Sequence, residues 1–431
     1  MPSKSETFER ERVTQLSGAT DSIDESIEHA ANEPRWGLGF EKWLLHKSLT
    51  ALGNPPIEMV MWDGQTVKTS TADTVARIHY HNRTTLLKLL INPEENFGDA
   101  FTAGTVTVEG NLVDCIEVVL RARYALTDGS LLQKWLRTFL PQPRNSPLRA
   151  RKNIYHHYDI SNEFYKLWLD KQMAYTCAYF PTESTGLEQA QIAKFDHVCR
   201  KLWLQPGELV VEAGCGWGAL ALHMAREYGV KVHAYNISKE QLSYARQRAR
   251  QEGLEAQVSF IEGDYREIDG RYDAFVSVGM LEHVGINHFA ELGETINRVL
   301  KKHGRGLLHS IGRDKPRAMN NWIEKRIFPG AYPPSMQEMM SILEPWRFSV
   351  LDVENLRLHY AKTIEHWLDR YVSVESEVQV MFDEPFVRAW KLYLAGSAAT
   401  FKAGELQLFQ LLFARNANNR IPWHRGHLYD T

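Results

Sequence analysis

The sequence has little cysteine and no long uncharged apolar run. Four of its 431 residues are cysteines, and their spacing is not that of metal ligands: Cys115, Cys177, Cys199 and Cys215. In a chain of this length they do not form a disulfide framework, so we expect a reducing cytoplasm and no metal site. No apolar run is long enough to cross a bilayer. The first residues, MPSKSETFERERVTQ, lack the apolar core of a signal peptide, so we expect no such peptide.

An excess of positive charge is also absent. The formal net charge is −3, with 24% charged and 44% hydrophobic residues. This balance is typical of a globular protein with a large core, and it gives no reason to expect nucleic acid as a partner. The sequence contains no internal repeat and no low-complexity block. Its length is sufficient for two domains.

The first third of the chain predicts a small accessory domain without catalytic residues. Residues 1–34 are polar and have few large apolar side chains, so we expect a disordered tail. Residues 35–140 combine strand-like and helix-like patterns, which predict an α+β domain. Expected strands are Ile57–Trp62 and Thr105–Glu109, and expected helices are Asp73–Ile78, Thr84–Leu90 and Leu112–Ala125. Residues 141–152, PQPRNSPLRARK, are rich in proline and basic residues and predict an extended linker.

The rest of the chain is organised around the stretch VVEAGCGWGALALHMA, Val210–Ala225. Its apolar start predicts a buried strand that ends near Glu212, and a helix is expected after the third glycine. Between them, Gly214, Gly216 and Gly218 allow positive φ angles and a close approach of a ligand to the backbone. The N-terminus of the helix then points its N–H groups at that ligand. The spacing differs from the dinucleotide fingerprint G-x-G-x-x-G, because the third glycine comes one position early.

Strands and helices alternate regularly after this stretch. Expected strands are Lys231–Ile237, Val258–Glu262, Ala274–Gly279, Gly306–Ile311, Phe348–Leu356 and Leu406–Asn416, and expected helices are Ser238–Gln251, His288–Leu300 and Lys362–Ser373. This order predicts a doubly wound, mostly parallel α/β sheet, in which ligands bind at the carboxyl ends of the strands. Polar residues gather at those ends: Glu212, Asn236, Asp264, Glu282 and His309. An excursion at about 313–345, rich in proline and aromatic residues, is expected to cover the site.

Seven motifs in this part of the chain resemble those of one enzyme family. The glycine turn resembles the first motif of S-adenosylmethionine-dependent methyltransferases. HHYDISNEFY, YTCAYF, EAGCGWGALA, VGMLEHVG, LLHSIG, IFPGAYPPS and HYAKT occur in that order. Together they resemble the cyclopropane-fatty-acyl-phospholipid synthases and mycolic acid cyclopropane synthases, from Asn153 to the C-terminus. FGDAFTAGTVTVEGNL, Phe97–Leu112, is similar to the accessory domain of longer bacterial members, though less closely.

The resemblance implies a class I methyltransferase fold, which is Rossmann-like, in a catalytic domain spanning residues 153–431. It also implies S-adenosyl-L-methionine as co-substrate and a bound bicarbonate as base. The residues that it implies around the bicarbonate are Cys177, Glu282, His309, Ile311 (through its backbone N–H) and Tyr360. The residues that it implies around the cofactor are Tyr175, Thr176, Glu212, Gly214, Gly216, Asn236, Ile237, Gln241, Asp264 and Tyr265. Asn236 stands where most methyltransferases have an acidic residue for the ribose, and Gln241 is placed to share that role.

The implied activity is the transfer of a methylene group to the cis double bond of unsaturated acyl chains in membrane phospholipids, which closes a cyclopropane ring. A related reaction loses the proton elsewhere and leaves a methyl- or methylene-branched chain. An alternative of a different class is a lipid-binding protein with a vestigial methyltransferase domain. The intact glycine turn and the complete set of base-site residues argue against that alternative.

The implied substrate lies in a bilayer, and the sequence has no apolar run that would span one. We therefore expect a peripheral protein on the inner face of the membrane. The expected contacts are Arg144, Arg149, Arg151 and Lys152 in the linker, and Trp322, Lys325, Arg326 and Phe328 in the excursion. Cations mixed with aromatic side chains are typical of interfacial segments. A homodimer is compatible with the sequence, which does not fix the oligomeric state.

Overall fold

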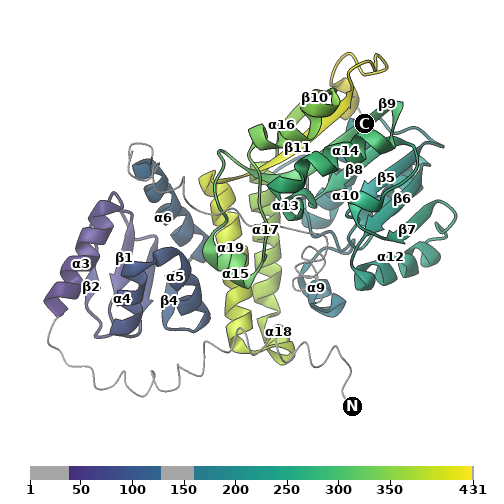
Figure 1. Ribbon diagram of the computed structural model, residues 1–431. Helices are drawn as coiled ribbons and strands as arrows, with labels where there is room; N and C mark the ends of the chain where they lie inside the picture. The colour runs from purple at the N-terminus through teal and green to yellow at the C-terminus, as the bar shows by residue number, and fades with distance from the viewer. Residues whose placement is uncertain (1–37, 128–159, 430–431) are drawn as a thin grey trace. The chain divides into compact units, whose positions relative to one another are not determined.

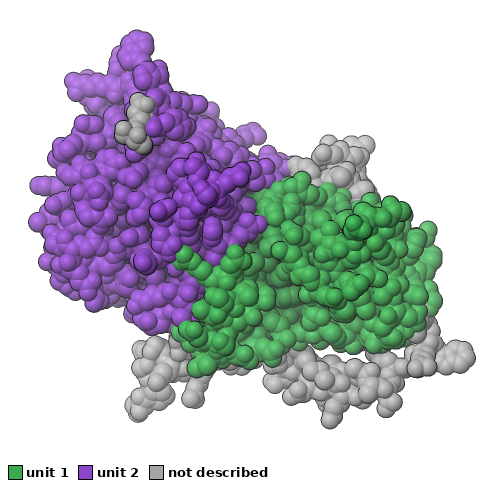
Figure 2. All heavy atoms as spheres, turned by 180° about the vertical axis from the view of Figure 1, so that it is seen from behind, with its two compact units in different colours: residues 1–141, 320–327, 368–403 green, residues 142–319, 328–367, 404–431 purple. Residues whose placement is uncertain are grey.

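The structure is a computed structural model that describes residues 38–127 and 160–429 (Figure 1). The chain divides into two compact units, which Figure 2 shows in different colours. Unit 1 comprises residues 1–141, 320–327 and 368–403, and unit 2 comprises residues 142–319, 328–367 and 404–431. The predicted tail, 1–34, and the predicted linker, 141–152, lie outside the described residues. Two segments from the second half of the chain therefore belong to the same unit as the N-terminal region.

Unit 1 is built on a four-stranded sheet in the order β2-β1-β3-β4. The strands are β1 (Ile57–Val60), β2 (Thr66–Val67), β3 (Ala76–Tyr80) and β4 (Val106–Gly110). β1 and β3 are parallel, and the other two pairs are antiparallel. The helices are α3 (Leu38–Ala51), α4 (Arg83–Ile91), α5 (Pro93–Thr102), α6 (Leu112–Thr127), α15 (Asn321–Arg326), α18 (Glu375–Met381) and α19 (Glu384–Ala403). The strands predicted at 57–62 and 105–109 and the helices predicted at 84–90 and 112–125 are confirmed within a few residues.

The prediction of a helix over Asp73–Ile78 is wrong, because this segment enters strand β3. Ala76, Ile78 and Tyr80 are buried, and the residues between them are more exposed. That alternation is the period of a strand with one buried face. β3 also pairs with β1 on one side and β4 on the other, so it is one of the two inner strands of the sheet.

Helix α15 lies in the excursion and packs within unit 1, where it contacts α5. Trp322 is buried there. Lys325 is ion-paired with Glu95, and Arg326 Nε lies 3.2 Å from Asp99 Oδ1. These two cations, which we expected at an anionic membrane surface, are therefore matched by acidic residues of their own unit.

Unit 2 contains a seven-stranded sheet in the order β10-β11-β9-β8-β5-β6-β7 (Figure 1). The strands are β5 (Leu209–Ala213), β6 (Lys231–Asn236), β7 (Val258–Glu262), β8 (Tyr272–Val278), β9 (Leu300–Arg313), β10 (Phe348–Asn355) and β11 (Leu406–Arg415). The neighbouring strands β9, β8, β5, β6 and β7 are parallel, whereas β11 is antiparallel to both of its neighbours. This arrangement confirms the predicted doubly wound sheet. The chain runs from β5 outward through β6 to β7 and then returns to β8 on the other side of β5, so the strand order reverses there and the carboxyl end of β5 is the expected place for a ligand.

Helices cover both faces of this sheet. They are α9 (Asn162–Trp168), α10 (Leu187–Lys201), α11 (Ala219–Tyr228), α12 (Lys239–Gln251), α13 (Leu281–Val284), α14 (Phe289–Val299), α16 (Met336–Leu343) and α17 (Arg357–Ser373), whose last residues belong to unit 1. Leu307 packs with α10, α11 and α12, whereas Leu308 packs with α14 and α16. Because consecutive strand residues point to opposite faces, β9 is buried on both sides, which explains its apolar run.

Candidate active site

The glycine turn after β5 uses its glycines in different ways. Gly214, Gly216 and Gly218 have φ angles of 86°, 53° and 81°, which L side chains rarely adopt. A Cβ on Gly218 would lie 2.6 Å from the ring of Phe260, so this glycine permits close packing at the start of α11. A Cβ on Gly216 would meet nothing within 4 Å. The backbone of Gly216 therefore borders open space, as a ligand-binding turn requires.

Strand β6 ends beside this turn with a pair of neutral amides. Asn236 Nδ2 donates to Gln241 Oε1 at 2.8 Å and to the carbonyl oxygen of Gly216 at 3.2 Å. The next residue, Ile237, is half-buried. The structure thus brings together the residues that were predicted at the ribose, and their amides offer donors and acceptors without a charge.

Asp264 and Tyr265 follow β7 at the same edge of the sheet. The N–H of Gly263 donates to the carbonyl oxygen of Asn236 at 3.1 Å, which holds this loop against the end of β6. Asp264 Oδ1 accepts from the N–H of Arg266 at 3.0 Å, and its Oδ2 lies 3.1 Å from Arg266 Nη1. The Arg266 guanidinium in turn lies 4.7 Å from the ring centroid of Tyr265. The Asp264 carboxylate therefore shapes the loop that carries Tyr265.

A buried lysine that the sequence analysis missed lies next to two predicted cofactor residues. Lys194 on α10 donates from Nζ to Thr176 Oγ1 at 2.7 Å. Burial lowers the pKa of Lys194 to about 8 and raises the pKa of the Glu212 carboxyl to about 8, and the attraction between these two groups opposes both shifts. Glu212 Oε2 is buried and has no hydrogen-bond partner. The sequence does contain an indication that Lys194 is buried, because it lies four residues after Ala190 and so on the apolar face of the helix.

A chain of aromatic rings connects the glycine turn to α17. The successive ring pairs, with centroids 5.0, 5.4, 5.2 and 6.0 Å apart, are Trp217–Tyr165, Tyr165–Tyr175, Tyr175–Trp367 and Trp367–Tyr360. Trp217 is fixed by a hydrogen bond of 2.7 Å from its Nε1 to Asn162 Oδ1. This aromatic chain joins Tyr175, predicted at the cofactor, to Tyr360, predicted at the base. Faces of such rings attract cations.

Glu282 and Ile311, both predicted at the base, are in direct contact. Glu282 Oε1 accepts from the backbone N–H of Ile311 at 2.6 Å, and Glu282 Oε2 is buried without a partner. Burial raises the pKa of the Glu282 carboxyl to about 7. Because a backbone N–H carries one hydrogen, Ile311 already holds Glu282 in this structure. No pattern in the sequence indicates this link.

His309 lies two residues before Ile311 on β9, so the two residues share a face of the sheet. His309 Nδ1 lies 3.0 Å from Gln410 Nε2 on β11, whereas His309 Nε2 is buried without a partner. Burial lowers the pKa of the ring well below its usual range, so the imidazole is neutral. Gln410 is the second residue that the sequence analysis missed.

Cys177 and Tyr360 lie on two segments that are held together. Cys177 is fully buried and donates from Sγ to the carbonyl oxygen of Ala178 at 3.1 Å. Burial raises the pKa of the Cys177 thiol, so it stays protonated and acts as a donor rather than a base. The N–H of Ala178 donates to Thr363 Oγ1 at 3.0 Å, which ties this segment to α17 one turn after Tyr360.

The second half of the excursion contacts the helix that carries Glu282. The N–H of Tyr332 donates to the backbone carbonyl oxygen of Glu282 at 2.7 Å. The rings of Phe328 and His283 have centroids 5.9 Å apart. Residues 328–332 therefore cover α13 within unit 2.

Comparison with known proteins places this site in a family. A family described as mycolic acid cyclopropane synthetase matches residues 145–411, and one described as a domain of unknown function matches residues 44–130. A "Probable fatty acid methyltransferase" of Pseudomonas putida is 36% identical, over 87% of this chain and 96% of the relative. The "Cyclopropane-fatty-acyl-phospholipid synthase" of Escherichia coli (strain K12) is 38% identical, over 62% of this chain and 68% of the relative.

A solved structure of the same kind has a similar fold over part of this chain. It is the mycolic acid cyclopropane synthase CmaA1 complexed with SAH and CTAB, which is 29% identical. The TM-score is 0.59, and the match covers 64% of this chain and 99% of that one. SAH, S-adenosylhomocysteine, is what S-adenosylmethionine becomes when it has lost its methyl group. The chain belongs to the mycolic acid cyclopropane synthetase family and is an S-adenosylmethionine-dependent methyltransferase.

Proposed function

We propose that the protein transfers a methylene group from S-adenosyl-L-methionine to the cis double bond of unsaturated acyl chains in membrane phospholipids, forming a cyclopropane ring. The observation that carries the proposal is the pair of buried polar atoms without protein partners, Glu282 Oε2 and His309 Nε2. Both residues are held at the carboxyl end of β9, Glu282 through Ile311. Ring closure needs a proton acceptor beside the transferred methyl group, and this polar pair offers a place for one.

The reaction makes two carbon–carbon bonds. The methyl carbon leaves the sulfonium as its C–S bond breaks and bonds to one alkene carbon, which leaves a cation at the other. Loss of a proton from the new methyl group supplies the electron pair that closes the ring, and S-adenosylhomocysteine is released. An alkene is a poor nucleophile, so orientation and the exclusion of water carry much of the rate. The aromatic chain from Trp217 to Tyr360 offers faces that stabilise the cation without trapping it.

The base-site residues fit a bicarbonate ion. When bound, bicarbonate would supply the group that accepts the proton. His309 Nε2 and Tyr360 would donate hydrogen bonds to the ion. The thiol of Cys177 already donates to the carbonyl oxygen of Ala178, so it would act by sharing that hydrogen. Glu282 Oε2 would accept from the hydroxyl of the ion. Since the N–H of Ile311 is engaged by Glu282, Ile311 would act by sharing its hydrogen or by orienting the carboxylate.

The cofactor would lie along the carboxyl ends of β5, β6 and β7. The residues that we propose at its methionine end are Tyr175, Thr176, Glu212, Gly214 and Gly216. Those that we propose at the ribose and adenine are Asn236, Ile237, Gln241, Asp264 and Tyr265. The open space beside Gly216 and the amide pair next to it support this placement.

The substrate requires contact with a bilayer. No helix within residues 38–127 and 160–429 is long and apolar enough to cross a membrane. We therefore assign the protein a peripheral position on the cytoplasmic face of the membrane, from which an acyl chain is drawn into the site. The linker cations from Arg144 to Lys152 are candidates for this contact, and they lie outside the described residues.

A second candidate is methylation that leaves a methyl- or methylene-branched acyl chain. The same cation produces it when a proton is lost from another position. The relative named "Probable fatty acid methyltransferase" matches 87% of this chain, whereas the Escherichia coli synthase matches 62%. That wider match keeps branching as the alternative, and the structure of the product decides between the two.

The base site is tested by Glu282→Gln, which keeps the size of the side chain and an acceptor for Ile311. We expect normal affinity for S-adenosylmethionine, measured by calorimetry, and turnover lowered by about 10² to 10⁴-fold. Turnover by the wild-type protein should also fall in bicarbonate-depleted buffer at fixed pH. Glu294→Gln, an exposed carboxylate on α14, is the matched control and should behave as wild type. Wild-type turnover in Glu282→Gln would show that the base lies elsewhere.

A further inference from the structure

Gln410 lies opposite His309 in the antiparallel pair of β9 and β11. Its Nε2 is 3.0 Å from His309 Nδ1, and both side chains are buried. Residues directly opposite each other share a face of the sheet. Here it is the face covered by α10, α11 and α12, since Leu307 and Leu412, two residues away on each strand, pack there.

This contact determines which ring nitrogen of His309 carries the hydrogen. In this orientation of the amide, in which Gln410 Oε1 is buried without a partner, Nε2 donates and does not accept, so Nδ1 is the acceptor and carries no hydrogen. Burial lowers the pKa of the ring well below its usual range, so the ring holds one hydrogen in total. That hydrogen then sits on Nε2, which has no partner in the protein. The ring is left with one N–H group to offer a ligand.

The charged groups around the ring do not determine which of its nitrogens carries the hydrogen. Glu354 on β10 lies opposite Gln410, but its Oε2 is 2.6 Å from His197 Nε2 and 2.7 Å from Lys201 Nζ. Lys194 and Lys201 both disfavour a positive charge on the ring. The tautomer of the neutral ring is therefore set by the hydrogen bond from Gln410 rather than by an ion pair.

We propose that Gln410 is a positioning residue that fixes His309 as the Nε2–H tautomer, so that the ring presents a donor to the bound anion. The inference rests on the proposed function for the identity of that anion, but not for the tautomer. Gln410 itself contacts no reacting atom. Without Gln410 the hydrogen would distribute between the two nitrogens, and the Nδ1–H form would turn a lone pair toward the anion.

The direct test is nitrogen NMR of protein labelled at histidine, in which protonated and unprotonated ring nitrogens give separate signals. The chain has 17 histidines, so the signals of His309 are identified by their loss in His309→Asn. In the wild type we expect a protonated Nε2 and an unprotonated Nδ1. In Gln410→Met, which keeps the volume and removes the donor, we expect both tautomers.

A kinetic measurement accompanies the spectrum. In Gln410→Met the KM for bicarbonate should rise about tenfold, the effect of one lost hydrogen bond, while the affinity for S-adenosylmethionine stays unchanged. Gln407→Met is the matched control on the same strand. The Gln407 amide bonds Asn355 and the carbonyl oxygen of Gly404, away from His309, so both readouts should match the wild type.

The outcomes separate this inference from the proposed function. A wild-type His309 ring with its hydrogen on Nδ1 overturns the inference without any variant. An unchanged tautomer in folded Gln410→Met overturns it as well. If the tautomer changes as expected while bicarbonate affects no variant, the role of Gln410 stands and the proposed base fails.

Discussion

Gly216 is the residue at which cofactor binding can be tested without disturbing the fold. Gly216→Val adds a side chain where a Cβ meets nothing within 4 Å, so unit 2 should stay folded. The branched side chain would occupy the space through which the cofactor approaches the backbone. We expect binding of S-adenosylmethionine to be lost in calorimetry, with an unchanged circular dichroism spectrum.

The control for backbone strain is Gly253→Val. Gly253 follows α12 and has a φ of 69°, and a Cβ there also meets nothing within 4 Å. It therefore carries a similar strain of roughly 1–2 kcal/mol without facing the glycine turn. Gly253→Val should bind the cofactor normally. A folded Gly216→Val protein with wild-type affinity would remove Gly216 from the cofactor site.

A functional residue could be predicted where a sequence motif marks it, but not where its role depends only on contacts made in the fold. Glu282 and His309 stand out in sequence because they are polar residues at the ends of apolar strands. Gln410 does not, since its contact with His309 depends on the register of two antiparallel strands about a hundred residues apart. Lys194 likewise acquires its surroundings only when α10 packs on the sheet beside Glu212.

At the scale of elements, the sequence predicts unit 2 better than unit 1. The bounds of β7 agree with the prediction, and those of β6 differ by one residue, because each contains β-branched and aromatic residues and ends in a polar residue. β3 was mistaken for a helix. Its five residues are too few to distinguish the two periods, and its assignment depends on pairing with β1 and β4.

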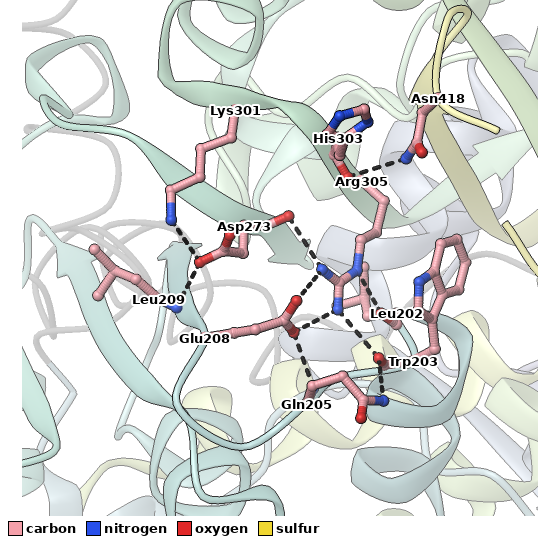
Figure 3. A network of polar contacts seen from close by, with 10 residues as sticks. All are labelled: Leu202, Trp203, Gln205, Glu208, Leu209, Asp273, Lys301, His303, Arg305 and Asn418. Atoms are coloured by element: carbon pink, nitrogen blue, oxygen red, sulfur yellow. Dashed lines mark hydrogen bonds and ion pairs between the residues drawn. The ribbon is translucent and has the colours of Figure 1, made fainter. Parts of the chain in front are cut away.

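A buried arginine holds the amino ends of the parallel strands, on the side of the sheet opposite the site. Arg305 on β9 donates to Glu208 through two nitrogens, each at 2.6 Å, to Leu202 O at 2.6 Å, to Trp203 O at 3.2 Å and to Asp273 O at 3.4 Å (Figure 3). Removing the cation would take the arginine donor from Glu208 Oε1 and from the carbonyl oxygen of Leu202, whereas Gln205 still donates to Glu208 Oε2 and to Trp203 O. We expect Arg305→Met to destabilise the protein by about 3 kcal/mol in urea unfolding.

The variant should be compared with Arg226→Met. Arg226 is ion-paired with Glu227 and Glu252 on the surface of α11, so its loss should cost less than about 1 kcal/mol. Because Arg305 lies at the amino ends of β5 and β8, folded Arg305→Met should keep its affinity for S-adenosylmethionine. Equal stabilities of the two variants would mean that Arg305 does not hold this end of the sheet.

At the scale of the whole molecule, the division into units could not be read from local patterns. The sequence predicts a boundary at the proline-rich linker, yet residues 320–327 and 368–403 belong to unit 1. The ion pair of Lys325 with Glu95 joins residues 230 positions apart. Local composition does not predict such a contact, whereas it does predict the order of strands and helices in unit 2.

The measurement that tests the central claim most directly is the structure of the product formed by the purified protein. The substrates are a phospholipid with a cis-unsaturated acyl chain and S-adenosylmethionine with a fully deuterated methyl group. We predict a product that retains two of the three deuterium atoms, has lost the alkene and takes up no hydrogen over a catalyst that reduces alkenes. A product that keeps all three deuterium atoms, or one with two that still takes up hydrogen, would be a branched chain and would contradict the proposal of ring closure.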